Sequence, residues 1–397
     1  MTTRPPKICH LITNLNGRYG SSRRTVLEVD YLKKHGYEVD LIVGHEVDPV
    51  FLESLRGRGW RIFVVDQMRK EVSVPLDPLA FLAIRKIFRR NRYDLVHTHL
   101  AKAGILGRLA AWAAGVPFVV HGVHGSSFPD HKPAWQRWTF LALERQAANC
   151  TSAFIFVGRE LMARYRRSRI GDPATYHLIY TGRDFAPFLQ TAAWPPEKKA
   201  EIRNSLGFGP EEVIVGVVAR LVPGKGHLVA LKAMNSLREQ FPNLRLLFIG
   251  DPDPPEAMGF RQELERLVAA WNLQEAVTFL RHQEDIARIY AILDILIMPS
   301  EHEGLPNVLV EGGVMQLPVV AYECDGVGEI LGDLVTVVPQ GDETGFIAAL
   351  AQVMVDLVRN DAEREKRRSK AREIATRWSL EKMLVTTKEL YDNFFKN

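Results

Sequence analysis

The sequence is poor in cysteine and in long hydrophobic runs. Its 397 residues include only Cys9, Cys150 and Cys324. An odd number of cysteines so far apart argues against a disulfide framework and against a cysteine-based zinc site. The longest apolar stretch, LAAWAAGVPFVV, is well short of the roughly 20 residues that a membrane-spanning helix needs. The opening segment MTTRPPKICHLITNL has no apolar signal core, so we expect a cytoplasmic protein that does not span a membrane.

Charge is distributed unevenly along the chain. The net charge is +4, but residues 1–190 contain 28 lysines and arginines against 16 acidic residues, whereas the rest contains 23 against 31. The overall composition, 46% hydrophobic and 25% charged, is that of an ordinary globular protein. The basic first half therefore predicts an anionic partner on that side of the molecule.

β-rich segments alternate with helical patterns in both halves of the chain. In the first half, such segments cover 7–15, 23–36, 37–44, 94–100, 103–115 and 117–125. Strands that alternate with helices of ~10–15 residues predict βαβ units and parallel sheets. The stretch GRDFAPFLQTAAWPPEKKAE, rich in proline and polar residues, interrupts the pattern near mid-chain, and the alternation then restarts.

The fold prediction follows from this alternation. We predict an α/β protein with two doubly wound Rossmann-like domains that face each other across a cleft. Residues 1–187 form the first domain and residues 188–378 the second. A C-terminal helix over 379–397 is expected to pack back onto the first domain.

Two glutamates flank the start of a predicted helix in SEHEGLPNVLVEGG. Glu303 and Glu311 have seven residues between them. Because proline is favoured in the first helical turn, Pro306 predicts a helix start between Leu305 and Asn307. Glu303 then lies in the loop after a strand, and Glu311 lies one to two turns inside the helix.

Such a carboxylate pair fits several roles, namely a hydrolase acid and base, a metal site, acceptors for sugar hydroxyls, or solvated surface acids. Two helical residues eight positions apart would be ~12 Å apart. Glycosidase pairs are ~5–9.5 Å apart, which disfavours the hydrolase. The helix start offers N–H groups around Gly304 to Asn307 and a positive dipole end. It therefore suits an anion and disfavours a metal, while surface acids remain an alternative.

Two cations, Arg220 and Lys225, follow the first predicted strand of the second half, in VVARLVPGKGH. Fixed cations at a strand end suit a diphosphate leaving group, because they stabilise the charge that grows as the bond breaks. Cations in a surface turn are the alternative. The segment lacks the GxxxxGK[ST] pattern of a P-loop.

Histidines gather at the predicted strand ends of the first half. They are His97, His99, His121, His124 and His131. Metal ligation is an alternative, but no cysteine or acid cluster completes a site, so we expect hydrogen bonds to a ligand or structural roles. The loop NLNGRYGSSRRT, with Gly17 and Gly20, does not match GxGxxG and only weakly supports dinucleotide binding. Such a loop can instead close over a phosphate or an acceptor.

These segments together resemble the retaining glycosyltransferases of family 4, which have the GT-B fold. The resemblance covers nearly the whole chain. PSEHEGLPNVLVEG is similar to the family's Glu–x(7)–Glu motif, and VVARLVPGKGH, HTHLAKAGILGRLAA, VHGSSF and IYTGRDFAPF resemble further family segments. The chain departs from the family in YGSSR, where Gly-Gly-Ala-Glu is usual, and in Thr181, where asparagine is usual. Gly312 and Gly313 stand where alanine is commoner, which predicts close backbone packing.

The resemblance implies a set of site residues by position. Arg220 and Lys225 hold the donor diphosphate, and Glu303 contacts the donor sugar. Glu311 binds the ribose, and His124 points at the sugar. The other donor-binding positions are Gly20, Gly304, Leu305, Pro306 and Asn307. Glu303, His124, Arg220 and Lys225 are the expected catalytic residues, and His99 and Lys102 are assigned to the acceptor.

The resemblance also implies an activity. The expected enzyme moves a sugar, with retention, from a nucleotide-sugar donor (a UDP-sugar) to a lipid-linked or polysaccharide acceptor in the synthesis of lipopolysaccharide, capsule or exopolysaccharide. No cofactor and no metal are expected, because the cations and the helix dipole take the metal's place. The alternatives are a nucleotide-sugar epimerase of the same fold and a non-catalytic nucleotide-sugar-binding subunit. No nucleic-acid partner is expected.

One predicted helical stretch is basic and is a candidate contact surface for the expected anionic partner. FLAIRKIFRRNR places Phe81, Ile84 and Phe88 at helical spacing. Arg85, Lys86, Arg89 and Arg90 surround them, and RYRRSR adds further arginines. Such a stretch binds anionic lipid, or it is the solvated face of a helix packed on the core. With the family's lipid-linked acceptors in view, we expect peripheral association with the cytoplasmic face of the inner membrane.

Overall fold

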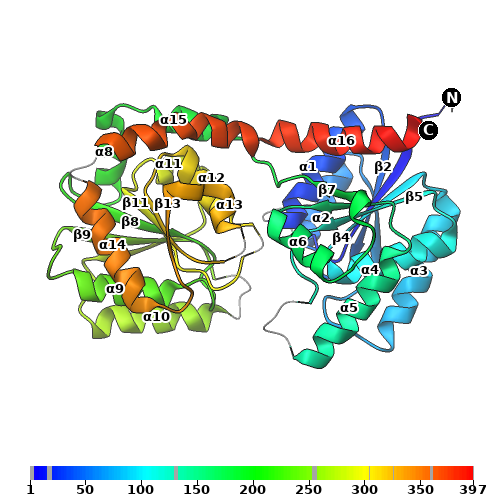
Figure 1. Cartoon of the computed structure of the whole chain (residues 1–397), viewed down its shortest axis with the longest axis horizontal. Coiled ribbons are helices and arrows are strands. Elements are labelled where there is room, and N and C mark those ends of the chain that lie inside the picture. Colours follow the sequence, from blue (N-terminus) through cyan, green and yellow to red (C-terminus); the bar gives the residue numbers. More distant parts are fainter. Residues whose placement is uncertain are drawn as a thin grey trace. The chain divides into compact units, whose positions relative to one another are not determined.

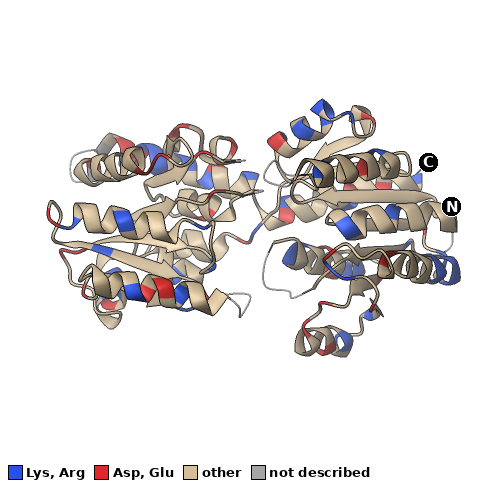
Figure 2. Ribbon diagram, turned by 90° about the horizontal axis from the view of Figure 1, so that it is seen from below, with Lys and Arg blue, Asp and Glu red and all other residues tan. Residues whose placement is uncertain are grey.

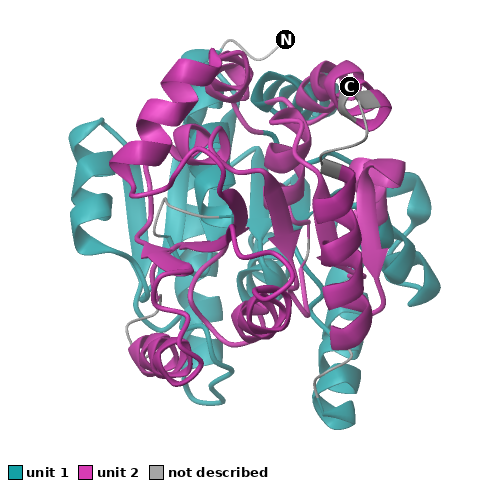
Figure 3. Cartoon of the chain, turned by 90° about the vertical axis from the view of Figure 1, so that its left-hand side faces the viewer, with its two compact units in different colours: residues 1–182, 380–397 teal, residues 183–379 magenta. Residues whose placement is uncertain are grey.

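The computed structural model describes residues 4–15, 20–128, 133–252, 257–303, 305–324, 326–357 and 361–396. The chain divides into two compact units (Figure 3). Unit 1 comprises residues 1–182 and 380–397, and unit 2 comprises residues 183–379. The sequence placed the corresponding boundaries at 187/188 and 378/379.

Unit 1 contains a parallel sheet in the order β3-β2-β1-β4-β5-β6-β7. Its strands are β1 Lys7–Ile12, β2 Glu38–Gly44, β3 Arg61–Val65, β4 Leu95–His99, β5 Phe118–Val123, β6 Ala153–Phe156 and β7 Tyr176–Leu178. Its helices are α1 Gly20–Lys34, α2 Pro49–Gly57, α3 Leu76–Asn91, α4 Ala101–Ala114, α5 Ala134–Ala148, α6 Arg159–Arg167 and α16 Leu380–Lys396.

Both faces of this sheet are covered, because the strands are apolar on both sides (Figure 1). In β1, Ile8 and Ile12 join the core beneath α1 and α16, whereas Cys9 and Leu11 join the core beneath α3 and α4. This alternation follows the period of two that side chains have along a strand. Helix α16 contributes Tyr391, which has no exposed surface, to the first of these cores.

Unit 2 contains a second parallel sheet in the order β10-β9-β8-β11-β12-β13. Its strands are β8 Val213–Val218, β9 Leu244–Ile249, β10 Val277–Leu280, β11 Ile295–Met298, β12 Val319–Tyr322 and β13 Val335–Val338. Its helices are α7 Ala186–Ala192, α8 Pro196–Ser205, α9 His227–Leu237, α10 Met258–Ala270, α11 Ile286–Tyr290, α12 Asn307–Val314, α13 Val327–Leu331, α14 Glu343–Leu357 and α15 Asp361–Arg377.

The predicted α/β class and the two doubly wound Rossmann-like sheets are confirmed. In each sheet the strand order reverses once, between β1 and β4 in unit 1 and between β8 and β11 in unit 2. The loops after two such strands leave in opposite directions, which opens a crevice at the carboxyl ends of the strands. Ligands of doubly wound sheets bind in this crevice, so site residues are expected at these two points.

Candidate functional site

The reversal point of unit 2 brings together two predicted residues that are far apart in the sequence. Lys225 follows β8 and Glu303 follows β11. The Lys225 Nζ atom donates a hydrogen bond to Glu303 Oε1 at 2.7 Å. The side chains are 20% and 21% exposed, so both reach solvent and can exchange this contact for a ligand. Arg220 is exposed in the same loop as Lys225.

A glycine allows the Lys225 turn to approach the end of β11. Gly226 has φ +77°, and a Cβ atom there would lie 2.0 Å from the backbone oxygen of Pro299. Residues with side chains rarely adopt such a φ. The amide of Glu301 also donates to the carbonyl oxygen of Gly224 at 2.9 Å, which ties the two loops together. The position of Lys225 beside Glu303 therefore depends on backbone contacts.

Helix α12 begins at Asn307, within the predicted range. Pro306 occupies the cap position with φ −77° and ψ 93°, so its expected place inside the first turn is wrong by one residue. Proline has no N–H group, and Pro306 therefore offers no donor to an anion. Leu305 and Asn307 are partly buried beside it. Gly304 lies outside the described residues.

Glu311 is the fifth residue of α12 and is only 4% exposed. Its carboxylate forms an ion pair with Arg183, whose guanidinium group lies 4.9 Å from the centre of the Phe188 ring. The buried Tyr290 is next to it, and burial together with the Glu311 charge raises the pKa of Tyr290. An isolated buried carboxylate costs several kcal/mol, and a close cation offsets that cost. The sequence did not identify Arg183 as a site residue, because a single arginine in IYTGRDF matches no binding pattern.

The two glycines after Glu311 pack as predicted. A Cβ atom on Gly312 would lie 2.4 Å from Leu296 Cδ2, and one on Gly313 would lie 2.5 Å from Leu331 Cδ2. Helix α12 therefore lies directly on β11, the strand that precedes Glu303. The close contact holds Glu311 at a set depth below the strand ends.

In unit 1 the predicted His99 and His124 form a chain of hydrogen bonds with His10, which the sequence did not single out. His99 ends β4, and His124 follows β5. The ring atoms His99 Nδ1 and His124 Nε2 are 3.0 Å apart, and His99 Nε2 is 3.0 Å from His10 Nδ1. Gly122 makes room for these rings, because a Cβ atom there would lie 2.9 Å from His124 Nε2. Burial lowers the pKa of His10 and of His124 to about 3, so both rings are neutral.

Below this chain lies a polar group that contains the predicted His97 and adds residues that the sequence did not indicate, Glu28 among them. His97 contacts the hydroxyl of Tyr391 at 2.5 Å through its Nδ1 atom. Glu28, from the middle of α1, accepts a hydrogen bond from Arg24 Nε at 2.8 Å. Among the described residues, ligand atoms of His10, Glu28, His97 and His99 lie within 4.8 Å of one another. These four residues could hold a divalent metal, but Arg24 already neutralises the one carboxylate and His10 and His99 already bond each other.

The two residues assigned to the acceptor are not on an open surface. His99 has no exposed surface, so it supports His124 from below. Lys102, at the second position of α4, is 9% exposed. Its Nζ atom pairs with Asp77 Oδ1 at 2.6 Å and also contacts the backbone oxygen of Glu71. Gly20 begins α1 with φ +51°, while Gly17 and His131 lie outside the described residues.

The apolar stripe of α3 does not face lipid. Ile84 is fully buried and Phe88 is 1% exposed, and both pack in the core of unit 1. The exposed apolar residues of this helix are Leu79 and Leu82. Leu82 lines a shallow surface hollow with Arg85, Lys86, Arg89 and Arg90. Figure 2 marks the lysines and arginines of both units. Within the described ranges, no helix is both long and apolar enough to cross a bilayer.

Two family models match the chain. The model described as "Glycosyl transferase 4-like domain" matches residues 20–182, and "Glycosyl transferases group 1" matches residues 198–374. A similar curated protein is the UDP-Gal:alpha-D-GlcNAc-diphosphoundecaprenol alpha-1,3-galactosyltransferase of Escherichia coli, 27% identical over 95% of each chain. A second is the capsular polysaccharide biosynthesis glycosyltransferase CapM of Staphylococcus aureus, 20% identical over 93% of each chain. The structure of Anabaena HepE in complex with UDP superposes with a TM-score of 0.76 and 20% identity, covering 98% of this chain and 100% of HepE.

The contact of Gly226 with Pro299 predicts an unequal effect of two alanine substitutions. Gly224 has a similar φ of +82°, but a Cβ atom there would meet nothing closer than Glu301 Oε2 at 3.8 Å. Gly224→Ala should cost about 1–2 kcal/mol of unfolding free energy through backbone strain alone. Gly226→Ala should cost clearly more, because the backbone of Pro299 must also move. Urea unfolding of both variants measures the difference, and equal losses would contradict the close contact.

The buried histidines predict a loss of stability in mild acid. Their pKa values are lowered by burial in the folded protein, whereas in the unfolded chain they return to about 6.5. Below pH 6.5 the unfolded state therefore binds more protons, and the free energy of unfolding falls as pH falls. Each histidine contributes up to about 1.4 kcal/mol per pH unit. Urea unfolding between pH 6.5 and 5 checks this, and His124→Gln should have a shallower dependence; a flat profile in the unaltered protein would contradict it.

Proposed function

The chain belongs to the family 4 glycosyltransferases, which have the GT-B fold, and from this premise we propose that it is a retaining, UDP-sugar-dependent enzyme that acts on a lipid-linked acceptor in cell-surface glycan synthesis. The observation that carries the proposal is the pairing of Lys225 with Glu303 at the reversal point of the unit 2 sheet. A cation and a carboxylate at this point match the two ends of a sugar diphosphate. The names of the E. coli and S. aureus relatives and the UDP bound to HepE support the donor and the acceptor class.

The proposed donor site assigns one role to each end of the donor. Arg220 and Lys225 bind the diphosphate and stabilise its charge as the sugar leaves. When the phosphates bind, Lys225 turns from Glu303 to them, which frees the Glu303 carboxylate for the sugar hydroxyls. Glu311 binds the ribose, and the ion pair with Arg183 offsets the cost of burying the Glu311 carboxylate.

The proposed chemistry requires no strong base in the protein. In front-face attack the leaving phosphate takes the proton of the acceptor hydroxyl, and the new bond forms on the face that the phosphate leaves. His124 is neutral, so it serves as a hydrogen-bond partner of the sugar and not as a cation. With two cations and the start of α12 on the phosphates, the proposal includes no metal ion in the transfer step.

Glu303→Gln should lower sugar transfer by about 100- to 1,000-fold, the usual effect of removing one charged stabilising contact from a transition state. UDP affinity should change little, because Glu303 contacts the sugar. Glu301→Gln is the matched control, since Glu301 is exposed two residues earlier and bonds its neighbours through the backbone. Transfer is measured with radiolabelled UDP-sugar, and UDP binding by calorimetry.

Product analysis in the same assay separates this proposal from its alternatives. Transfer of label to the lipid fraction supports a transferase. Conversion of the UDP-sugar to an isomer without an acceptor would indicate an epimerase, and binding without any product a non-catalytic subunit. Full transfer activity of Glu303→Gln would contradict the site assignment.

Peripheral membrane association on the cytoplasmic side is part of the proposal and rests on the basic residues of α3, of which Arg89 and Arg90 are exposed and Arg85 is partly buried. Each basic residue near an anionic bilayer contributes about 1 kcal/mol. Replacing Arg85, Arg89 and Arg90 with glutamate should therefore weaken binding to phosphatidylglycerol vesicles at least 100-fold. A matched charge change on α15, with glutamate at Arg368, Lys370 and Arg372, should have little effect. Vesicle sedimentation measures both, and unchanged binding of the α3 variant would contradict the proposal.

A further inference from the structure

Glu28, in the middle of α1, has one carboxylate oxygen without a hydrogen-bond donor. Its Oε1 atom accepts a hydrogen bond from Arg24 Nε at 2.8 Å, and Arg24 Nη1 donates to the carbonyl oxygen of Ile179 at 3.0 Å. No donor among the described residues reaches the Oε2 atom, although the side chain is 0% exposed. Buried polar atoms are nearly always hydrogen-bonded, so an unpaired carboxylate oxygen is unusual in the interior of a folded protein.

Two histidine ring nitrogens lie near this unpaired oxygen. His97 Nδ1 is 3.8 Å from Glu28 Oε2, and His10 Nδ1 is 4.0 Å from it. These distances are too long for hydrogen bonds. Arg24 balances the charge of Glu28 from the Oε1 side, but Oε2 is still a negative atom, and electrostatic forces are strong in a buried environment. The oxygen therefore favours an N–H group over a lone pair at His10 Nδ1.

The rings of His10, His99 and His124 have coupled tautomers. His10 Nδ1 is 3.0 Å from His99 Nε2, and His99 Nδ1 is 3.0 Å from His124 Nε2. A neutral imidazole has one N–H group and one acceptor nitrogen. If His10 donates through Nδ1, then His99 accepts at Nε2 and donates through Nδ1, and His124 accepts at Nε2. All three protons are then on Nδ1. In the opposite arrangement all three are on Nε2.

The buried end of the chain favours the arrangement with all protons on Nδ1. The charge of Glu28 favours an N–H group at His10 Nδ1. The opposite arrangement would place a proton on His10 Nε2, a buried atom that has no partner in the described part of the chain. A buried N–H group without an acceptor is costly, and unpaired N–H groups are rarer in proteins than unpaired acceptors. Both effects act in the same direction.

We propose that Glu28 is a positioning residue that makes His124 a hydrogen-bond donor through its Nδ1–H group. Glu28 acts through His10 and His99 and does not touch a substrate. His124 is partly exposed, and its Nδ1 atom bonds none of the described residues, so this atom is available to a ligand. The inference rests on the proposed function, in which His124 meets the donor sugar. The sugar group at this point must then accept a hydrogen bond, as a hydroxyl or carbonyl oxygen does and an ammonium group does not.

NMR of the full chain with ¹⁵N-labelled histidine reads the tautomers directly, because ring nitrogens with and without a proton have well-separated chemical shifts. We expect the protons of His10, His99 and His124 on Nδ1, whereas neutral histidine in water has its proton mainly on Nε2. Single histidine-to-glutamine variants assign the signals. Protons on Nε2 of His99 and His124 in the unaltered protein would overturn the inference.

Glu28→Gln should reverse the chain. Arg24 needs an acceptor and so keeps the amide oxygen at the Oε1 position, which places the amide NH₂ group near His10 Nδ1, where it repels an N–H group. The three protons should move to Nε2. Sugar transfer should fall about tenfold, the usual effect of losing one hydrogen bond, with UDP affinity unchanged. If His124 keeps its proton on Nδ1 in this variant, Glu28 has no positioning role. If the variant does not fold, the spectrum of the unaltered protein still decides.

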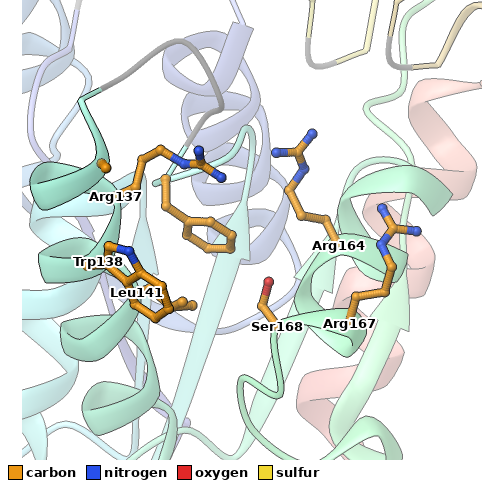
Figure 4. Close-up of a pocket in the computed structure, with 8 residues that line it drawn as sticks. Arg137, Trp138, Leu141, Arg164, Arg167 and Ser168 are labelled. Carbon is orange, nitrogen blue, oxygen red and sulfur yellow. The ribbon is translucent and has the colours of Figure 1, made fainter.

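Glu144→Gln is the matched control for the loss of a buried ion pair. Glu144 has no exposed surface and pairs with the buried Arg108 at 2.6 Å, but its other hydrogen bond comes from Ser127 Oγ and not from a histidine. It lies on α5, the helix that lines the groove between α5 and α6 with residues such as Trp138 (Figure 4). This variant should lose stability and keep all three protons on Nδ1. The same tautomer change in both variants would indicate a general loosening of unit 1 and would contradict a specific role of Glu28.

A metal ion at this place is the competing explanation of the unpaired oxygen. An ion held by His10, Glu28, His97 and His99 would occupy ring lone pairs and would leave no proton between His10 and His99. One zinc ion per chain in the purified protein, measured by mass spectrometry, would therefore overturn the inference, whereas protein without bound metal and with the Nδ1 protons supports it.

The inference and the proposed function can fail separately. If the unaltered protein transfers no sugar to any lipid-linked acceptor, the proposed function is wrong, while the tautomers and their response to Glu28→Gln are still measured. If transfer is normal but the protons of His99 and His124 are on Nε2, the role of Glu28 is wrong and the proposed function stands.

Discussion

The candidate donor site depends on one close backbone contact, between the Gly226 turn and the end of β11. The turn after β8 and the loop after β11 diverge, because the strand order of the sheet reverses there. The absence of a side chain on Gly226 lets the backbones meet, and the amide of Glu301 joins the loops from the other side. Lys225 and Glu303, which we propose to bind the phosphates and the sugar, are therefore positioned by main-chain geometry.

Helix α12 fixes a second feature of the site, the depth at which Glu311 lies. Gly312 and Gly313 let the helix lie directly on Leu296 and Leu331, and this places Glu311 below the surface. A carboxylate at that depth is stable because Arg183 neutralises it. The two glutamates of the motif thus differ in environment: Glu303 pairs with Lys225 and reaches solvent, whereas Glu311 is enclosed. The exposed Glu303 suits the proposed contact with the reacting sugar. The enclosed Glu311 suits the proposed binding of the ribose.

Unit 1 separates its polar groups into two environments. The histidines around His99 are neutral; His99 contacts His10 and His124 through its ring nitrogens, and His97 contacts Tyr391 through Nδ1. These contacts link β4 to the residue that follows β5. The arginines of α5 and α6, in contrast, lie around an open groove beside exposed tryptophans.

The sequence by itself determined the fold class and the order of the elements, because alternating apolar strands and amphipathic helices have few ways to pack. It also determined the start of α12 near Pro306 and the close packing at Gly312 and Gly313, which are local effects of proline and glycine. Only the tertiary structure decided which distant residues meet. Arg183 is 128 positions from Glu311, and Glu28 sits among ordinary helix residues, so no local pattern marks either one. The structure likewise decided that Lys102 is used internally by Asp77 and that Ile84 and Phe88 face the core, because burial is a property of the packed chain.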